Sequence, residues 1–157
     1  MARIPLVLDS NLLLLLTVGL VGVEHIARHK RLRAYDAKDF LILSERVRQF
    51  SGLILCPNVA TDTSNLIRHA DRPLSSRYGE MLRALFASSE EQFVATVHAA
   101  GRAEYARLGV TDAVLLRMAE TGAYLLTADL ELYIAALAGG LPAENFAHLQ
   151  ALRADYQ

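Results

Sequence analysis

Short runs of hydrophobic residues separate longer stretches with helical spacing along this chain. IPLVLD, which ends at Asp9, and AYLLTAD, which ends at Asp129, are two such runs, and LILCP before position 58 is a third. A short apolar run bounded by helical patterns is typical of a buried parallel strand. We therefore expect three strands at these places, with ENFAHL near the end of the chain as a fourth.

The stretches between these runs predict helices. The leucine-rich run at 12–23 is too short to span a bilayer, and too little positive charge precedes it for a signal peptide, so we expect a buried core helix. Hydrophobic residues on one face predict a helix at about 39–50, and Pro57 suits the first turn of a helix over NVATDTSNLIRHA. Residues 73–108 are expected to be wholly helical, with a break near Ser88.

Another helix is expected around Asp112. Thr111 is a suitable N-cap, apolar residues recur at helical spacing after it, and Gly122 follows as a stop. After Asp129, LELYIAALAGG predicts a helix that ends at its glycine pair. Asp112 and Asp129 therefore each lie close to the beginning of a helix.

The order of these elements favours an α/β fold with three layers, in which helices cover both faces of a mainly parallel sheet. The 157 residues are 53% hydrophobic, which is enough to bury most of one core, and they contain no repeat or Pro/Gly-rich linker. We therefore expect one domain over residues 1–157. The single cysteine, Cys56, excludes an internal disulfide and fits a reducing compartment, so we expect a soluble, cytoplasmic protein without a membrane segment.

Charge limits how the chain can contact nucleic acid. The formal net charge is −1, from 16 basic and 17 acidic residues, so any contact with phosphates must be local. The densest basic segment contains Arg28, Lys30, Arg31 and Arg33. This segment predicts either a nucleic-acid contact or a solvated helix end. His25 and His29 are one helical turn apart, but no acid lies between them as in a zinc-protease motif, so we expect no zinc there.

Four aspartates are expected at one edge of the sheet. Asp9 and Asp129 end two of the predicted strands. Asp112 lies in the first turn of a helix, and Asp62 lies near the start of the helix that follows LILCP. In open α/β sheets the binding site forms at the carboxyl ends of the strands. The alternatives are that Asp9 only caps the next helix and that Asp62 belongs to a solvated helix face.

Close carboxylates need a counter-charge. Each pair at roughly 4 Å repels by on the order of 4 kcal/mol at an effective dielectric near 20. A hard divalent cation removes this repulsion, and a site made only of oxygen ligands suits Mg²⁺ or Mn²⁺. Such a metal ion activates a water and neutralises charge on a phosphoryl group, so the predicted reaction is phosphodiester hydrolysis.

Three blocks of sequence carry a family resemblance: LVLDSNLLL, CPNVATDTSNLI and GVTDAVLLRMAETGAYLLTADLEL. Together they resemble the PIN-domain family of metal-dependent nucleases, which includes VapC-type toxins of bacterial toxin–antitoxin pairs. The resemblance covers most of the chain but is weak at 18–52 and 73–106. It implies an RNA substrate, a homodimer and, for a toxin, a small antitoxin protein as partner.

The resemblance also assigns roles to individual residues. It makes Asp9, Asp112 and Asp129 ligands of the metal ion. Asp62 occupies the place where the family usually has glutamate, which is one methylene longer. Asn11 and Thr127 match polar residues that flank the first and last acids, which implies that the two residues orient these carboxylates.

The leading functional hypothesis is a Mg²⁺- or Mn²⁺-dependent endoribonuclease, either a toxin or an RNA-processing enzyme. The alternative is a catalytically silent PIN-like module that binds RNA or protein, because Asp62 departs from the family pattern and the net charge is near zero. A haloacid dehalogenase phosphatase would need a second aspartate two residues after Asp9, where this chain has Asn11.

Overall fold

A parallel sheet lies at the centre of the computed structural model, which describes residues 3–155. Its strands are β1 (Leu6–Leu8), β2 (Ile54–Leu55), β3 (Glu90–Glu91), β4 (Tyr124–Thr127) and β5 (Ala143–Asn145). Strand β4 pairs with both β1 and β5, and β2 pairs with β3. A parallel bridge between Leu6 and Leu53 joins the two groups, so the spatial order is β3-β2-β1-β4-β5.

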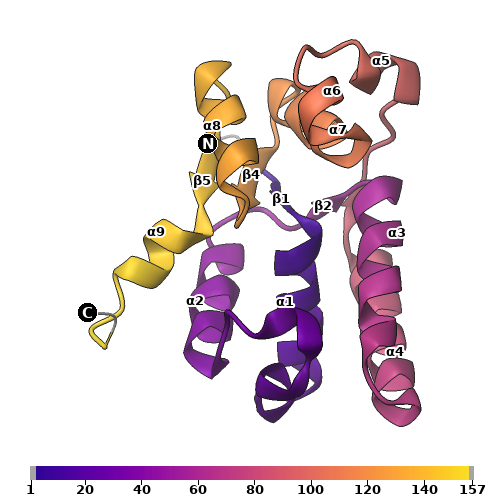
Figure 1. Ribbon diagram of the computed structural model, residues 1–157, viewed down its shortest axis with the longest axis vertical. Helices are drawn as coiled ribbons and strands as arrows, with labels where there is room; N and C mark the ends of the chain where they lie inside the picture. Colours follow the sequence, from indigo (N-terminus) through magenta and orange to yellow (C-terminus); the bar gives the residue numbers. More distant parts are fainter. Residues whose placement is uncertain (1–2, 156–157) are drawn as a thin grey trace.

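Helices surround this sheet. They are α1 (Ser10–Val21), α2 (Ala37–Arg48), α3 (Pro57–Leu66), α4 (Arg72–Ser88), α5 (Thr96–Ala100), α6 (Tyr105–Leu108), α7 (Val110–Glu120), α8 (Leu130–Ala138) and α9 (Phe146–Ala151), with the 3-10 helices η1 (Val23–Arg28), η2 (Lys30–Leu32) and η3 (Ile67–His69). Figure 1 shows α1 to α4 on one side of the strands and α5 to α8 on the other. The predicted α/β fold, with helices around a parallel sheet, is confirmed.

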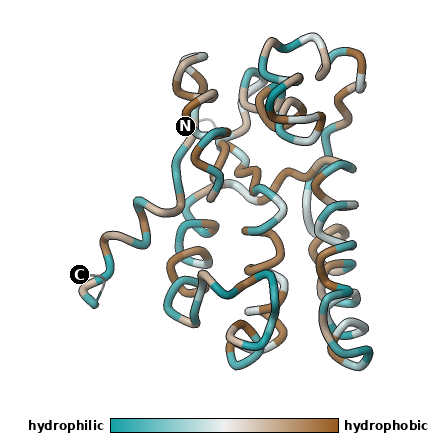
Figure 2. The backbone as a smooth tube through the Cα atoms, viewed as in Figure 1, coloured by the Kyte–Doolittle hydropathy of each residue, from teal (hydrophilic) through white to brown (hydrophobic). Residues whose placement is uncertain are grey.

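Helix α1 is the centre of the core. Every residue from 12 to 19 is buried, and the helix packs against α2, α3 and α4, so the predicted core helix is confirmed. Gly19 permits this packing, because a Cβ atom at that position would collide with the ring of Phe40 on α2. The chain changes character after α1, where the segment through η1 and η2 is mainly hydrophilic (Figure 2). No helix within residues 3–155 is long and apolar enough to cross a membrane.

Two segments differ from the sequence prediction. Residues 73–108 are not wholly helical, because β3 follows α4 and adds to the edge of the sheet. The Glu90 N–H donates to the Leu53 carbonyl at 3.1 Å, and the Gln92 N–H donates to the Leu55 carbonyl at 2.8 Å. These bonds to a neighbouring strand replace those of a helical turn. Near the end of the chain the expected strand is present as β5, but it ends at Asn145, which caps α9.

Candidate functional site

Asp9 lies between the end of β1 and the start of α1, where it is 8% exposed. Its Oδ1 atom accepts the Leu12 N–H at 2.9 Å and thereby caps α1. Its Oδ2 atom accepts the Thr127 hydroxyl at 2.6 Å and the Ala128 N–H at 2.7 Å. Since both of these donors follow or end β4, Asp9 is at once a helix cap and a link between two strand ends.

Asp129 is the N-cap of α8. Its Oδ1 atom accepts the N–H groups of Glu131 at 2.9 Å and Leu132 at 3.1 Å, whereas its Oδ2 atom takes no part in these bonds. The Asp129 N–H donates to the Thr127 hydroxyl at 3.0 Å. The buried Thr127 therefore holds the Asp9 side chain and the Asp129 backbone together, which is the orienting position expected for it.

Asp62 is half-buried on α3, and its Oδ2 atom accepts the Thr111 hydroxyl of α7 at 2.9 Å. The prediction that Thr111 caps its helix is wrong, because α7 begins at Val110 and its N-cap is Gly109. Gly109 has φ of 90°, a left-handed conformation that glycine adopts without strain. The Thr111 hydroxyl therefore contacts the neighbouring helix instead of its own backbone, and it is a site residue that sequence reasoning misread as a cap.

Asp112 lies half-buried in the first turn of α7. Burial, followed by the negative charges of Asp129, Asp9 and Asp62, raises the pKa of Asp112 to about 7. Burial raises the pKa of Asp9 as well, and the charge of Asp129 adds to this effect although hydrogen bonds oppose it. The structure thus brings the four predicted aspartates close enough to influence one another. We call this group the acidic cluster.

The acidic cluster has no counter-charge of its own. Within the described range 3–155, none of its carboxylates forms an ion pair with Lys, Arg or His. In the same range, no group of three or more His, Cys, Asp or Glu side chains is already arranged to hold a metal ion, so binding requires rotation of at least one carboxylate.

The chemistry of the donor set nevertheless fits Mg²⁺ or Mn²⁺. The cluster offers only oxygen atoms, carries surplus negative charge, and contains a carboxyl whose pKa burial and the neighbouring carboxylates raise to about 7. Asp112, together with the Asp62 and Asp129 oxygens that accept none of the hydrogen bonds described above, would hold the ion.

Tyr35 is a neighbour of the acidic cluster that sequence reasoning missed. Burial, followed by the charges of Asp9 and Asp39, raises the pKa of Tyr35 to about 12, so its hydroxyl stays protonated at neutral pH. The ring packs against Phe146 with centroids 6.0 Å apart. No spacing pattern connects positions 35 and 9. Asn11, in contrast, is exposed in the first turn of α1, and no hydrogen bond of the described residues connects its side chain to the cluster.

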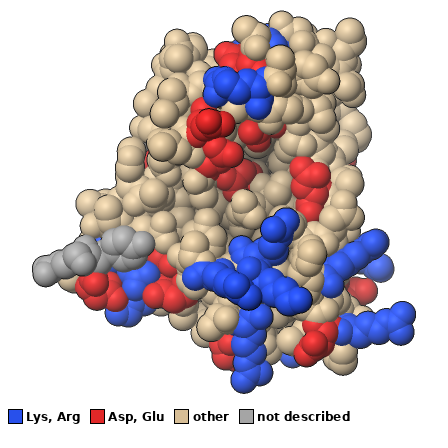
Figure 3. All heavy atoms as spheres, in the orientation of Figure 1, with Lys and Arg blue, Asp and Glu red and all other residues tan. Residues whose placement is uncertain are grey.

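The predicted basic residues lie on the surface beyond the C-terminal end of α1, the helix whose N-terminal end Asp9 caps. They are Arg28, Lys30, Arg31 and Arg33, all exposed on or beside η1 and η2. Figure 3 shows Lys and Arg side chains gathered over these two segments, directly below a hollow lined by acidic side chains. A nucleic-acid strand can therefore meet positive charge and the acidic cluster on one face of the molecule.

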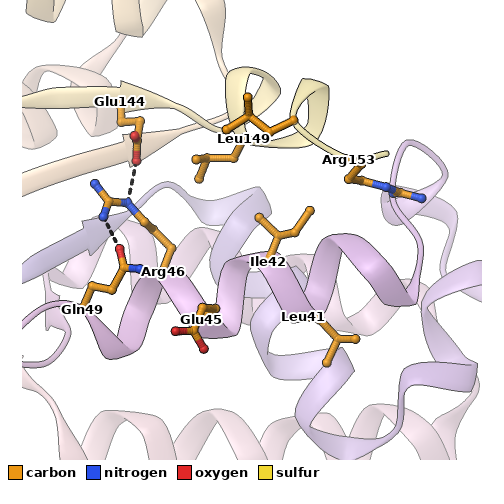
Figure 4. A pocket seen from close by; sticks show the side chains of 9 residues that line it. Leu41, Ile42, Glu45, Arg46, Gln49, Glu144, Leu149 and Arg153 are labelled. Atoms are coloured by element: carbon orange, nitrogen blue, oxygen red, sulfur yellow. Dashed lines mark hydrogen bonds and ion pairs between the residues drawn. The ribbon is translucent and has the colours of Figure 1, made fainter. Parts of the chain in front are cut away.

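A cavity of about 630 Å³ lies elsewhere, between α2 and the segment β5–α9 (Figure 4). Its walls carry exposed apolar side chains, including Leu41 and Leu152, and an ion pair of 2.8 Å between Arg46 Nε and Glu144 Oε1. It contains none of the four aspartates. The acidic cluster therefore lies outside this cavity.

Comparisons with protein-family models, with characterised proteins and with solved structures give no significant match. The functional argument consequently depends on the sheet, on the geometry of the acidic cluster and on the motifs in the sequence.

Removal of the Thr127 hydroxyl is expected to loosen the acidic cluster. Thr127→Val leaves Asp9 without its 2.6 Å donor and the Asp129 N–H without an acceptor, so the free energy of unfolding falls by about 1–2 kcal/mol and any metal-dependent activity of the cluster falls at least about tenfold. Thr17→Val is the matched control, because it removes a buried hydroxyl that bonds only the Leu13 carbonyl. Denaturant unfolding and activity per folded molecule distinguish the two variants. Equal activity in both would contradict the orienting role of Thr127.

Proposed function

We propose that this protein is a Mg²⁺- or Mn²⁺-dependent endoribonuclease with a PIN-like active site. The observation that carries the proposal is the acidic cluster: the charges of Asp129, Asp9 and Asp62 all act on Asp112, and together with burial they raise its pKa to about 7. A hydrolase that cleaves phosphodiesters with a metal ion needs such a group of oxygen ligands.

The arrangement of the chain supports the same reaction. Asp9 and Asp129 follow adjacent parallel strands, and Asp62 and Asp112 lie on helices that contact each other. The three sequence blocks that resemble PIN-family motifs each contribute an aspartate to the acidic cluster, which supports the proposal. The nearby positive charge over η1 and η2 suits the phosphates of an RNA strand.

Each side chain has a distinct part in the proposed mechanism. A bound divalent cation lowers the pKa of a water molecule and neutralises charge on the scissile phosphate. Asp112, Asp129 and Asp62 would hold the cation. Asp9, fixed by its bonds to Thr127 and to two backbone N–H groups, keeps the strand ends in register and adds negative charge beside the cation. Asp112, whose pKa is about 7 without a metal ion, would release its proton to solvent in order to act as a ligand.

The resemblance extends the proposal to partners. A toxin of this kind would form a homodimer, and a small antitoxin protein would cover the acidic cluster. A neighbouring open reading frame for a small protein, whose product blocks cleavage when both are expressed together, would support the toxin role. Cleavage that no such product inhibits would favour RNA processing.

One observation favours a second candidate, a catalytically silent module that binds RNA or protein. The Asp62 carboxylate, shorter than the usual glutamate, accepts the Thr111 hydroxyl at 2.9 Å, which turns one of its oxygens toward α7. If this bond persists in the presence of metal ions, Asp62 has only its other carboxylate oxygen left for the ion. The silent module would bind RNA in the presence and in the absence of divalent cations alike.

The deciding experiment is an RNA cleavage assay with the purified protein. We expect Mg²⁺ or Mn²⁺ to support internal cleavage of single-stranded or structured RNA, and EDTA to abolish it. Internal cuts, resolved on a gel with end-labelled RNA, separate an endonuclease from an exonuclease. RNA binding without cleavage under every metal condition would replace the nuclease by the silent module.

A further inference from the structure

A second polar cavity, of about 420 Å³, lies between the segment η1–η2 and the segment η3–α4. Its polar walls carry Arg28, Lys30 and Arg68, the histidines His25, His29 and His69, and a single acid, Asp71. We call it the histidine pocket. Arg28 and Lys30 of the predicted basic segment line this pocket together with side chains some forty positions further along the chain. Sequence spacing does not reveal this combination.

The buried His29 presents a fixed hydrogen-bond donor in this pocket. The ring is 2% exposed, and its Nδ1 atom accepts the Arg31 N–H at 3.2 Å. Burial, followed by the charge of His69, lowers the pKa of His29, so at neutral pH the ring has one proton, which must lie on Nε2. An interaction with the Leu66 carbonyl opposes this lowering of the pKa, but the carbonyl does not meet hydrogen-bond geometry, so Nε2 has no hydrogen-bond partner. A buried N–H donor of this kind requires an acceptor.

The cations of the histidine pocket are also without partners. None of Arg28, Lys30 and Arg68 forms an ion pair in the described part of the chain. Three positive side chains and a neutral N–H donor around one cavity suit an anion with several oxygen acceptors, and a phosphate group has this chemistry. The described histidines and acids of the pocket are not arranged as a group of three in metal-binding geometry, and the surplus of positive charge favours an anion over a cation.

The position of the pocket relates it to the acidic cluster. Asp9 caps the N-terminal end of α1, and η1 follows the C-terminal end of the same helix. With 12 residues, α1 is about 18 Å long. Figure 3 shows the positive charge over η1 and η2 and the acidic hollow on the same face. A single extended strand can therefore reach both.

We propose that the histidine pocket binds a backbone phosphate of the RNA strand, several nucleotides away from the phosphate at the acidic cluster. The inference rests on the proposed function for the identity of the strand. The pocket sets where the RNA lies on the surface, and it requires a substrate long enough to span α1.

The test measures binding in EDTA, so that it does not depend on cleavage. A fluorescent single-stranded dodecanucleotide is titrated with the wild-type protein, Arg68→Gln, His29→Asn and Arg83→Gln, with fluorescence anisotropy as the readout. Asn at position 29 keeps an acceptor for the Arg31 N–H, because Asn is a good N-cap, but it removes the Nε2 donor. Arg83→Gln is the matched control, since it removes an exposed arginine from α4 outside the pocket.

We expect Arg68→Gln and His29→Asn each to weaken binding about fivefold, and Arg68→Gln to reduce the slope of log affinity against log salt by about one. Inorganic phosphate should raise the melting temperature of the wild type, but not of these two variants, above a chloride control of equal ionic strength. Equal RNA affinity of Arg68→Gln and Arg83→Gln would overturn the proposal. If the RNA binds through the pocket but is never cleaved, the proposed nuclease function is contradicted, whereas the proposed phosphate site is supported.

Discussion

Replacement of Asp129 by asparagine is expected to reduce metal-dependent RNA cleavage at least about 100-fold while the fold stays intact. The fold survives because Asp129 caps α8 through Oδ1, and asparagine is an equally good N-cap whose side-chain oxygen can accept the same Glu131 and Leu132 N–H groups. Activity falls because an amide carries no negative charge for a divalent cation. Cleavage rates and thermal unfolding, measured on the same preparation, separate the two effects.

A matched control is available at another helix. Asp36 is the N-cap of α2 and lies outside the acidic cluster, so Asp36→Asn makes the same chemical change at the same kind of position. It weakens the ion pair of 2.8 Å with Arg153 and lowers stability slightly, but it should retain cleavage. Full cleavage by Asp129→Asn would exclude this aspartate as a metal ligand.

The second large effect concerns stability. In EDTA at pH 8, Asp112→Asn is expected to raise the free energy of unfolding by about 2 kcal/mol, after the full pKa shift is discounted for the solvent that reaches this carboxyl. For a chain of this size the melting temperature then rises by about 4–8 °C. The reason is that burial and, after it, the charges of Asp129, Asp9 and Asp62 disfavour ionised Asp112 in the folded state, whereas asparagine carries no charge. The same variant should lose cleavage.

The effect has a defined pH window. The pKa of Asp112 is about 7 in the folded protein against 3.8 for an unperturbed aspartate. Below about pH 4 the carboxyl is protonated in both states, so the variant has no advantage. As the pH rises from about 4 to 7, the wild type loses stability relative to Asp112→Asn, and above about pH 7 the difference stays constant. Urea unfolding at several pH values measures it directly, and a difference independent of pH would contradict the coupling.

Metal ions should make the wild type more stable than Asp112→Asn. Mn²⁺ at about 100 times its dissociation constant stabilises the wild type by about 2.7 kcal/mol, because it binds the folded state alone, and Asp112→Asn should gain much less. A wild type that Mn²⁺ and Mg²⁺ leave unchanged would argue against a metal centre. The acidic cluster would thus lower the stability of the metal-free protein and support activity when the metal ion is bound.

The sequence predicts those helices and strands that have a clear hydrophobic pattern or that end at a clear polar residue. The apolar runs before Asp9 and Asp129 form β1 and β4, and the leucine-rich run forms α1, because their burial leaves few alternatives. The strand-end rule then places the aspartates at one edge of the sheet. Strand β3 could not be predicted, since Glu90 and Glu91 are exposed and have no strand pattern, and only backbone bonds to β2 hold them there.

The contacts between distant segments were also beyond sequence reasoning. Thr111 is next to Asp112 in a pair that looks like a helix cap, but Gly109 takes over that role and the threonine bonds to Asp62 instead. Tyr35 feels the charge of Asp9 because α2, which Tyr35 precedes, packs against α1, which Asp9 caps. A side chain at such a junction has no local pattern that would identify it.

The bonds from Asp9 to the end of β4 have a consequence for synthesis on the ribosome. They connect Asp9 to Thr127 and Ala128, which lie 118 and 119 positions further along the chain. In the sheet, β1 pairs with β4. A nascent chain therefore cannot complete the acidic cluster until it has reached at least Asp129 of 157 residues. Pairing over such a distance makes folding slow. A product that ends before β4 has Asp9 but lacks the Thr127 and Ala128 groups that bond to it, so it cannot form the acidic cluster.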